Sequence, residues 1–436
     1  MAKFVINGGK KISGEITVNT AKNSAVALLC AALINRGVTR LKNIPAIEEI
    51  NRLAEVLISI GAPVKKEGHD LIVGPVAKIN LKNINVRAAE KTRSIILALG
   101  ALAGRLDSYA VPQAGGCRLG SRTVKPHLFA LEKLGLAVKT EKEKYVVAVK
   151  KLKPAEIILY ESGDTVTENV LLAAAQIKGE STIKFCTSNY MVRDLCYFLQ
   201  KLGVKIDGVA TSTLKVSGLE NIDKNIEYEI SEDPIEAMFF LAIAATTNSV
   251  LTIKCCPIDF LELELLKLEK MGYQFEIIKK YKGRNGLTNL VDIVTKPSKL
   301  KALEEKIHAL PFPGINQDNL PFFVPICTQA KGESLIHDWT YENRAIYYPE
   351  LNRLGAKIIL MDPHRVEIDG PTKLTGAEVV CPPALRPAAI ILVAMLAAQG
   401  KSTLYNIYPI HRGYERLEER LSAIGADIKL VEDAEK

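Results

Sequence analysis

The sequence predicts an α/β fold assembled from six similar units of about 70 residues. One observation is a hydrophobic residue followed by glycine and a short strand, which recurs at intervals of 74, 68, 69, 83 and 70 residues. The six glycines of this step are Gly61, Gly135, Gly203, Gly272, Gly355 and Gly425. A second observation is another turn residue that opens a β-rich stretch once in every unit. These turn residues are Gly37, Gly104, Gly179, Asn248, Gly332 and Gly400.

Two kinds of helix are expected between these marks. The helix before each second mark is apolar on nearly every side, which is typical of a helix buried all round. The residues of these helices are 25–34, 95–103, 170–177, 237–245, 322–327 and 388–398. The helix before each hydrophobic-Gly step is amphipathic, with Ile50, Leu53, Leu57 and Ile60 on one face in the first unit. Each unit should therefore run buried helix, strand, surface helix, strand, and the glycine after the surface helix should be left-handed.

The composition sets bounds on location and partners. The chain has 436 residues, 48% hydrophobic and 24% charged, as expected for a globular protein of two or three domains. Its eight cysteines are scattered without a C-x-x-C pair, which favours reduced thiols in a cytoplasm. The net charge of +8 would suit small anions or nucleic acid, but no run of five basic residues supports nucleic acid. The N-terminus lacks the apolar core of a signal peptide, and the longest apolar run, 387–398, is too short to span a bilayer. We expect a soluble, cytoplasmic protein that binds neither nucleic acid nor a membrane.

The loop 111–122 carries the most distinctive chemistry. Its Gly115-Gly116 pair allows positive φ and close approach of the backbone to a ligand. Cys117 lies within five residues of Arg118 and Arg122, whose charges favour a thiolate. The backbone N–H groups of this Gly-rich loop and the guanidinium groups of its two arginines also suit phosphate oxygens. The alternative is a tight surface turn with an inert, half-buried cysteine.

Three cations stand where buried helices should begin: Lys22, Arg93 and Arg386. The helix dipole disfavours a cation at this end, and a bound anion would remove the conflict. The alternative is that solvated first turns tolerate these cations. Pro234 and Pro387 are each expected at the first position of a helix. The other helix starts carry Thr167-Glu168-Asn169, Asp233 with Glu236, and Gln317-Asp318-Asn319.

Four stretches resemble the bacterial UDP-N-acetylglucosamine enolpyruvyl (1-carboxyvinyl) transferases. They are 14–25, the Gly-Gly-Cys loop with Arg122, Tyr341-Glu342-Asn343-Arg344, and 412–416. They occur in the family's order, and the likeness runs from about residue 3 to 430. The related shikimate-pathway enzymes are a poorer match because they lack the Gly-Gly-Cys loop. The resemblance implies six βαβαββ units in a two-domain inside-out α/β barrel, with residues 21–229 in one domain and 1–20 with 230–436 in the other.

The resemblance also implies the reaction. The enolpyruvyl group of phosphoenolpyruvate moves through a tetrahedral ketal to the 3-hydroxyl of UDP-N-acetylglucosamine, and phosphate is released, in the first committed step of peptidoglycan precursor synthesis. Neither a metal nor an organic cofactor is implied. Cys117 falls on the cysteine that protonates or traps phosphoenolpyruvate, and Asp318 on the carboxylate facing the sugar hydroxyl. Lys22, Arg122 and Arg386 fall on the family's cations that bind the phosphate and carboxylate groups of phosphoenolpyruvate. Residues for the sugar nucleotide are Asn23, Arg93, Thr340 and Arg344.

The chain departs from the family pattern mainly on the nucleotide side. Lys125-Pro126 replaces an Asp-Leu pair, and 163–165 differs in the uracil-contacting stretch. The segment 314–318 replaces the usual Phe-Pro-Thr-Asp around Asp318. Two histidines are further candidates for a role in the site. His127 lies ten residues after Cys117, and His411 stands where relatives carry an acid. Two alternatives therefore stay open: an enolpyruvyl transferase with another acceptor, and a non-catalytic relative that binds anions or nucleic acid.

Overall fold

The computed structural model describes residues 2–113, 115 and 123–432. These residues divide into two compact units. Unit 1 contains residues 2–19 and 232–432, and unit 2 contains 20–113, 115 and 123–231. The boundaries predicted before residues 21 and 230 differ by one and two residues from this division.

Unit 2 contains three sheets, with strand orders β13-β3-β5-β4, β6-β8-β7 and β11-β12-β10-β9. The strands are β3 (Thr39–Lys42), β4 (Val64–Glu67), β5 (Asp70–Val73), β6 (Ser108–Pro112), β7 (Leu136–Thr140), β8 (Lys144–Val149), β9 (Glu156–Ile158), β10 (Gly179–Lys184), β11 (Lys205–Asp207), β12 (Thr213–Gly218) and β13 (Ile226–Glu229). The helices are α1 (Lys22–Ala31), η1 (Ala32–Ile34), α2 (Glu48–Ser59), η2 (Leu81–Asn83), α3 (Val86–Ala89), η3 (Ser94–Leu97), α4 (Ala98–Ala101), α5 (Lys125–Lys133), α6 (Asp164–Ala174) and α7 (Tyr190–Lys201), where η marks a 3₁₀ helix.

Unit 1 also contains three sheets, ordered β21-β22-β1-β23, β15-β16-β14-β2 and β17-β18-β20-β19. The strands are β1 (Lys3–Gly8), β2 (Ser13–Thr17), β14 (Val250–Pro257), β15 (Gln274–Lys282), β16 (Asn289–Lys296), β17 (Ile307–His308), β18 (Gly332–His337), β19 (Lys357–Asp362), β20 (Arg365–Gly370), β21 (Glu378–Val380), β22 (Gly400–Tyr405) and β23 (Ile428–Val431). The helices are α8 (Pro234–Thr246), η4 (Ile258–Phe260), α9 (Glu262–Lys270), η5 (Leu320–Phe322), α10 (Phe323–Cys327), η6 (Ala345–Leu354), α11 (Leu385–Ala397), α12 (Tyr408–His411) and α13 (Leu417–Ala423).

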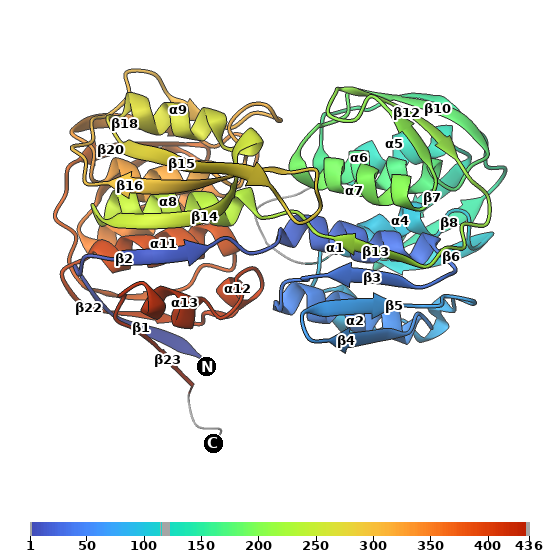
Figure 1. Ribbon diagram of the computed structural model, residues 1–436, viewed down its shortest axis with the longest axis horizontal. Helices are drawn as coiled ribbons and strands as arrows, with labels where there is room; N and C mark the ends of the chain where they lie inside the picture. Colours follow the sequence, from blue (N-terminus) through green and yellow to red (C-terminus); the bar gives the residue numbers. More distant parts are fainter. Residues whose placement is uncertain (1, 114, 116–122, 433–436) are drawn as a thin grey trace. The chain divides into compact units, whose positions relative to one another are not determined.

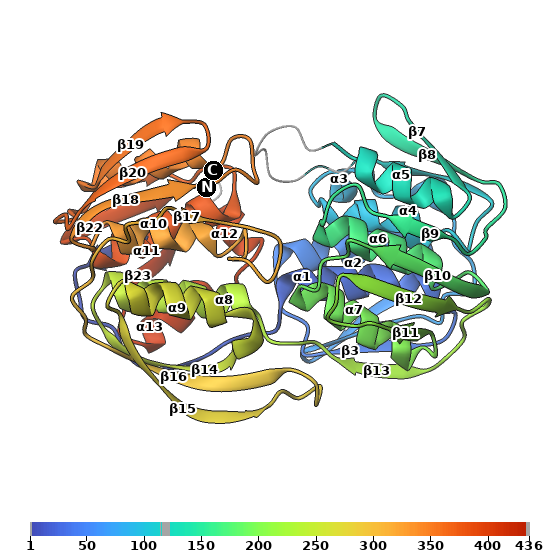
Figure 2. The same cartoon turned by 90° about the horizontal axis from the view of Figure 1, so that it is seen from above.

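Distant parts of the chain complete the sheets. The N-terminal β1 lies between β22 and β23 near the C-terminus, and β2 pairs with β14 in parallel (Figure 1). In unit 2, β13 pairs in parallel with β3, which precedes it by almost 190 residues (Figure 2). Each unit is therefore held together by pairings that no local sequence pattern reveals.

The predicted repeat is confirmed at its glycines. All six glycines that follow a surface helix have φ between +85° and +99°. Among the second marks, four are left-handed, whereas Gly37 and Gly104 are not. Both are instead tightly packed: a Cβ on Gly37 would lie 2.5 Å from the carbonyl oxygen of Lys224, and one on Gly104 would lie 2.8 Å from the side chain of Gln176.

The buried helices occur where the sequence predicts them, although two are short and irregular. The second begins as η3 before α4, and the fifth as η5 before α10. The surface helix η6 is a 3₁₀ helix with Pro349 inside it, which removes a backbone donor. Pro234 is the first residue of α8 as predicted. The prediction for Pro387 was wrong, because α11 begins at Leu385 and this proline is its third residue. A first-turn proline is tolerated there because the first N–H groups of a helix have no partner within it.

The core of unit 1 is formed by the buried helices. α8, α10 and α11 contact one another, and each contacts one of the three sheets. In unit 2, α4 contacts both α1 and α6. Because these helices are apolar on all sides, polar residues are confined largely to their ends. Among the described residues, no helix is long and apolar enough to cross a membrane.

Candidate active site

In unit 1, the start of α11 brings Arg386 to Asp318. Arg386 is the second residue of this helix and is only 7% exposed. Its Nη2 donates to Oδ2 of Asp318 at 3.1 Å, and its Nη1 donates to the hydroxyl of Tyr414 at 3.2 Å. Burial by itself would lower the pKa of Arg386, but the charge of Asp318, its hydrogen bond and the charges of other nearby groups together outweigh burial, so the pKa lies above its ordinary value. The guanidinium therefore stays charged at the helix start, as the sequence predicts.

Asp318 lies in the turn before η5, and neighbouring side chains hold this turn. Its backbone N–H donates to Oδ1 of Asn316 at 2.8 Å. The buried carboxylate of Glu264 accepts from the backbone of Asn316 at 3.0 Å and from Nδ2 of Asn319 at 2.9 Å. The side chain of Asp318 stays 21% exposed, whereas the arginines that contact it are buried. This carboxylate is thus the accessible member of the cluster.

A second arginine approaches Asp318 from the start of η6. The side chain of Arg344 is 0% exposed. Its Nε and Nη2 donate to the two carboxylate oxygens of Asp338 at 2.5 and 2.8 Å. Its Nη1 lies 3.8 Å from Oδ1 of Asp318. Thr340, predicted to bind substrate, places its hydroxyl 3.4 Å from Oδ1 of Asp338.

The start of α8 adds an acidic group to the same end of the core. Asp233 caps this helix, and its Oδ1 accepts from the backbone N–H of Ile235 at 2.8 Å. The charge of Asp233 acts on both Arg386 and Tyr414. Polar residues at the starts of α8, η5 and α11 therefore form one cluster of alternating charge. Asp338 belongs to it but is not predicted, because a single acid at a strand end gives no signal in the sequence. Tyr414 lies in the resembling stretch 412–416, although the sequence predicts no role for it.

In unit 2, Lys22 and Asn23 open α1. Lys22 is the first residue of the helix, and the preceding Ala21 offers no capping side chain. Nδ2 of Asn23 donates to the hydroxyl of Tyr190 at 3.0 Å, and Tyr190 is the first residue of α7. The first-turn N–H groups of α1 thus lie beside a cation and an amide, an arrangement that suits an anion.

Arg93 lies just before η3 and acts on a buried histidine. Nδ1 of His127 lies 3.1 Å from Nδ2 of Asn169, and the imidazole is 7% exposed. Burial first, and then the positive charge of Arg93, lower the pKa of His127 to about 4. The imidazole is therefore neutral at physiological pH. Because the amide of Asn169 donates to Nδ1, the proton is assigned to Nε2.

The same end of unit 2 contains a buried carboxyl group on α6. Glu168 is 3% exposed, and its Oε1 has no hydrogen-bond partner among the described residues. Burial first, and then the charge of Asp164, raise its pKa well above the ordinary value. The sequence predicts Glu168 at a helix start, but α6 begins at Asp164 and Glu168 is its fifth residue. Nothing in the sequence indicates that this side chain is buried.

Comparison with known proteins identifies the family. The sequence profile described as EPSP synthase (3-phosphoshikimate 1-carboxyvinyltransferase) matches residues 6–421 of this chain. The chain belongs to this enolpyruvyl transferase family. The resemblance inferred from the four stretches, among them the Gly-Gly-Cys loop, is thereby confirmed, and the chain is a transferase.

Curated relatives and solved structures agree with this assignment. The UDP-N-acetylglucosamine 1-carboxyvinyltransferase of Treponema denticola is 33% identical over 441 residues, covering 99% of this chain and 100% of the relative. That of Bacteroides fragilis is 31% identical over 440 residues with the same coverage. The crystal structure of the enolpyruvyl transferase NikO from Streptomyces tendae aligns with a TM-score of 0.86, at 23% identity over 99% of both chains. EPSP synthase from Acinetobacter baumannii aligns with a TM-score of 0.72, at 17% identity over 99% of this chain and 100% of its own. The two structural alignments confirm the predicted fold class.

Part of the predicted site of this transferase lies outside the described residues. Cys117 and Arg122 are both in that part of the loop. Gly115 is described, and its need for glycine comes from packing: a Cβ there would lie 1.6 Å from the carbonyl oxygen of Glu90. Lys125 is exposed and is the first residue of α5, and its backbone N–H donates to the hydroxyl of Thr123 at 3.2 Å.

His411 is the other histidine with a predicted site role. It lies at the end of α12, where its ring meets that of Phe4 edge to face, with the centroids 6.0 Å apart. Phe4 is fully buried in β1. The observed contact of His411 is therefore one of packing.

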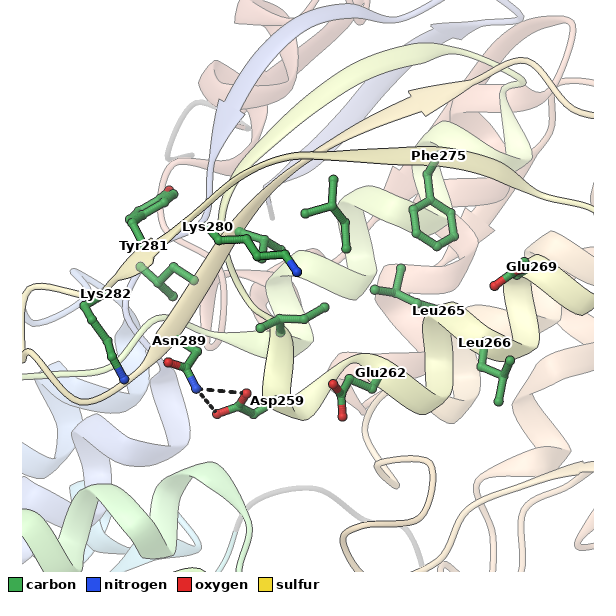
Figure 3. A pocket seen from close by; sticks show the side chains of 14 residues that line it. Asp259, Glu262, Leu265, Leu266, Glu269, Phe275, Lys280, Tyr281, Lys282 and Asn289 are labelled. Atoms are coloured by element: carbon green, nitrogen blue, oxygen red, sulfur yellow. Dashed lines mark hydrogen bonds between the residues drawn. The ribbon is translucent and has the colours of Figure 1, made fainter.

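A large groove of the transferase lies away from these residues. It has a volume of about 740 Å³ and lies between α9 and the strands β15 and β16 (Figure 3). Leu265 and Phe275 contribute apolar surface to it, and Lys280 is one of its charged residues. At one end Nδ2 of Asn289 donates to the carboxylate of Asp259 at 2.9 and 3.2 Å. The groove contains no residue of the predicted site, so it is not the candidate active site.

Proposed function

We propose that this chain transfers the enolpyruvyl group of phosphoenolpyruvate to the 3-hydroxyl of UDP-N-acetylglucosamine and releases phosphate. The observation that carries the proposal is an accessible carboxylate, Asp318, flanked by the buried guanidinium groups of Arg386 and Arg344. Curated relatives that cover the full chain bear the name of this activity. The reaction would make the chain an enzyme of peptidoglycan precursor synthesis.

The chemistry requires a base, an acid and anion-binding groups. The 3-hydroxyl oxygen adds to C2 of phosphoenolpyruvate while C3 gains a proton, which forms the tetrahedral ketal. Loss of phosphate and of a proton from C3 then restores the double bond. Asp318 accepts the proton of the sugar hydroxyl, and Cys117 protonates or traps phosphoenolpyruvate. The proton transfers by these groups are general acid-base catalysis.

Cations supply the binding energy for the very anionic phosphoenolpyruvate. Lys22, Arg122 and Arg386 hold its phosphate and carboxylate groups, since charge-assisted hydrogen bonds are stronger than neutral ones. The positive start of α1, which carries Lys22, adds the N–H groups of its first turn.

The sugar nucleotide contacts Asn23, Arg93, Thr340 and Arg344 in this proposal.

In the same proposal, residues 21–229 form one folding domain, and 1–20 with 230–436 form the other.

A phosphate-release assay tests the proposal. Purified chain is incubated with phosphoenolpyruvate and, separately, UDP-N-acetylglucosamine, 3-phosphoshikimate, other sugar nucleotides or no acceptor. We expect phosphate release with UDP-N-acetylglucosamine, and mass spectrometry should find the enolpyruvyl ether. Release only with another acceptor would favour the second candidate, a transferase of altered specificity. This candidate is supported by Lys125, which can only donate hydrogen bonds. If the chain releases no phosphate with any acceptor, it is a non-catalytic relative.

A further inference from the structure

We infer that Asp338 is a positioning residue, which holds Arg344 so that its free edge faces Asp318 and which affects enolpyruvyl transfer through that arginine. The inference rests on the proposed role of Asp318 as the carboxylate facing the acceptor hydroxyl. Asp338 touches no reacting group in this assignment. Its effect on turnover passes along the chain of contacts Asp338, Arg344, Asp318.

The first contact fixes the plane of the Arg344 guanidinium. Both carboxylate oxygens of Asp338 accept from one edge of this group, at 2.5 and 2.8 Å, and two parallel bonds define its orientation. Asp338 itself is 0% exposed and follows β18, where its backbone N–H donates to the carbonyl oxygen of His364 at 2.7 Å. The hydroxyl of Tyr348 donates to its Oδ2 at 2.5 Å. The carboxylate is therefore held from several sides.

The second contact directs the remaining edge of Arg344. The ring of Tyr341 lies against the guanidinium, 4.1 Å from its central carbon. With Nε and Nη2 engaged, Nη1 is buried and has no hydrogen-bond partner among the described residues. It lies 3.8 Å from Oδ1 of Asp318. A guanidinium is charged at every physiological pH, so this buried donor favours a short approach to the nearest carboxylate.

Asp318 is thus held between two arginines that contact different oxygens. Arg386 takes Oδ2 at 3.1 Å, and Arg344 faces Oδ1. This arrangement limits rotation of the carboxylate while leaving its side chain 21% exposed. Without the charge of Asp338, Arg344 would form a full ion pair with Asp318, and this carboxylate would then be a poorer proton acceptor. We therefore expect a loss in kcat, while the KM values change little.

A double-mutant cycle tests the inference. Asp338→Asn and Arg344→Gln are each expected to lower kcat by about 10-fold or more, since a general base contributes at least this much. Asp338→Asn should keep both KM values within about 3-fold of wild type, whereas Arg344→Gln should also raise the KM for the acceptor, because the proposed function has the sugar nucleotide contact Arg344. In the double variant, which buries a neutral amide pair, kcat should match that of Arg344→Gln alone. If Asp338→Asn does not fold, as judged by thermal unfolding, Tyr348→Phe takes its place in the same cycle with a smaller loss.

The control is an aspartate of the same unit with a similar partner. Asp362 pairs with Arg365 at 2.6 Å on the exposed turn between β19 and β20, and Asp362→Asn should retain wild-type kcat and KM. Three results would overturn the inference: multiplicative losses in the double variant, wild-type kcat in the folded Asp338 or Tyr348 variant, or a loss confined to KM. The assay uses whichever acceptor the panel identifies, so a wrong acceptor refutes the proposed function alone. If the wild-type chain releases no phosphate with any acceptor, both are refuted.

Discussion

Nη2 of Arg386 lies 3.1 Å from Oδ2 of Asp318, although 68 positions separate the two residues in the chain. Each residue stands near the start of a buried helix, one in the sixth repeat and the other in the fifth. Because α8, α10 and α11 contact one another in the core, the starts of successive repeats meet at one end of unit 1. A regular repeat therefore brings together polar residues that are far apart in the sequence.

This pairing allows a prediction for Arg386→Ala. The variant should fold, because α11 is held by apolar packing and the exposed side of Asp318 can be solvated. It loses a charge-assisted contact to phosphoenolpyruvate worth about 1.5 to 3 kcal/mol, so kcat/KM for phosphoenolpyruvate should fall by about 10- to 150-fold. Steady-state kinetics and thermal unfolding measure the two effects. The matched control is Arg365→Ala, which breaks an exposed ion pair of the same unit. An unfolded Arg386 variant, or one with wild-type turnover, would make Arg386 structural or peripheral.

A second prediction concerns the reactivity of Cys117. An epoxide analogue of phosphoenolpyruvate should alkylate this thiol selectively, with loss of activity, and peptide mass spectrometry should locate the adduct. Most other cysteines are poor competitors, because burial raises the pKa of Cys186, Cys327 and Cys381 to about 12. Cys255 is half-exposed, so Cys255→Ser provides the control and should be labelled like wild type. Labelling elsewhere with activity intact would refute the prediction.

The third prediction concerns the acceptor base. Lys125 is an exposed side chain at the start of α5, and its ammonium group cannot accept hydrogen bonds from a base. We expect wild type to discriminate weakly between UDP-N-acetylglucosamine and its dTDP and CDP counterparts. Lys125→Asp should increase that discrimination in kcat/KM by roughly tenfold, the value of one hydrogen bond to a charged group. Lys133→Asp makes the same charge change at the other end of α5 and should leave the ratio unaltered. Equal selectivity of wild type and Lys125→Asp would argue against the idea.

A fourth prediction follows from the buried imidazole of His127. Its pKa is about 4 in the folded chain and 6.5 for the ordinary group, so between these values only the unfolded chain binds the proton. The free energy of unfolding should therefore fall as pH drops from 6.5 to 4, by on the order of 3 kcal/mol from this group. Above pH 6.5 the imidazole is neutral in both states and contributes no slope. Denaturant unfolding of wild type and His127→Gln at several pH values should show a flatter profile for the variant. Parallel profiles would mean that His127 is not the group responsible.

Much of the fold could be predicted because its signals are local. The hydrophobic-Gly steps, the all-apolar helices and the amphipathic ones are each readable within about 15 residues. The positions after surface helices require a left-handed residue, and all six prove to be left-handed glycines. Prolines show the limit of such reasoning: Pro349 lies inside the 3₁₀ helix η6, and Pro387 stands at the third position of α11 instead of the first.

The six repeats, the two kinds of helix and the cations at helix starts follow from the local sequence, since each depends on neighbours along the chain. Which of these groups meet depends on the tertiary structure. It pairs Arg386 with Asp318, and it buries Arg344 on Asp338, an acid with no motif of its own. It also places Asn169 against His127. Such contacts depend on strand pairings between distant segments, as when β1 enters a sheet with β22 and β23, and local periodicity carries no information about them.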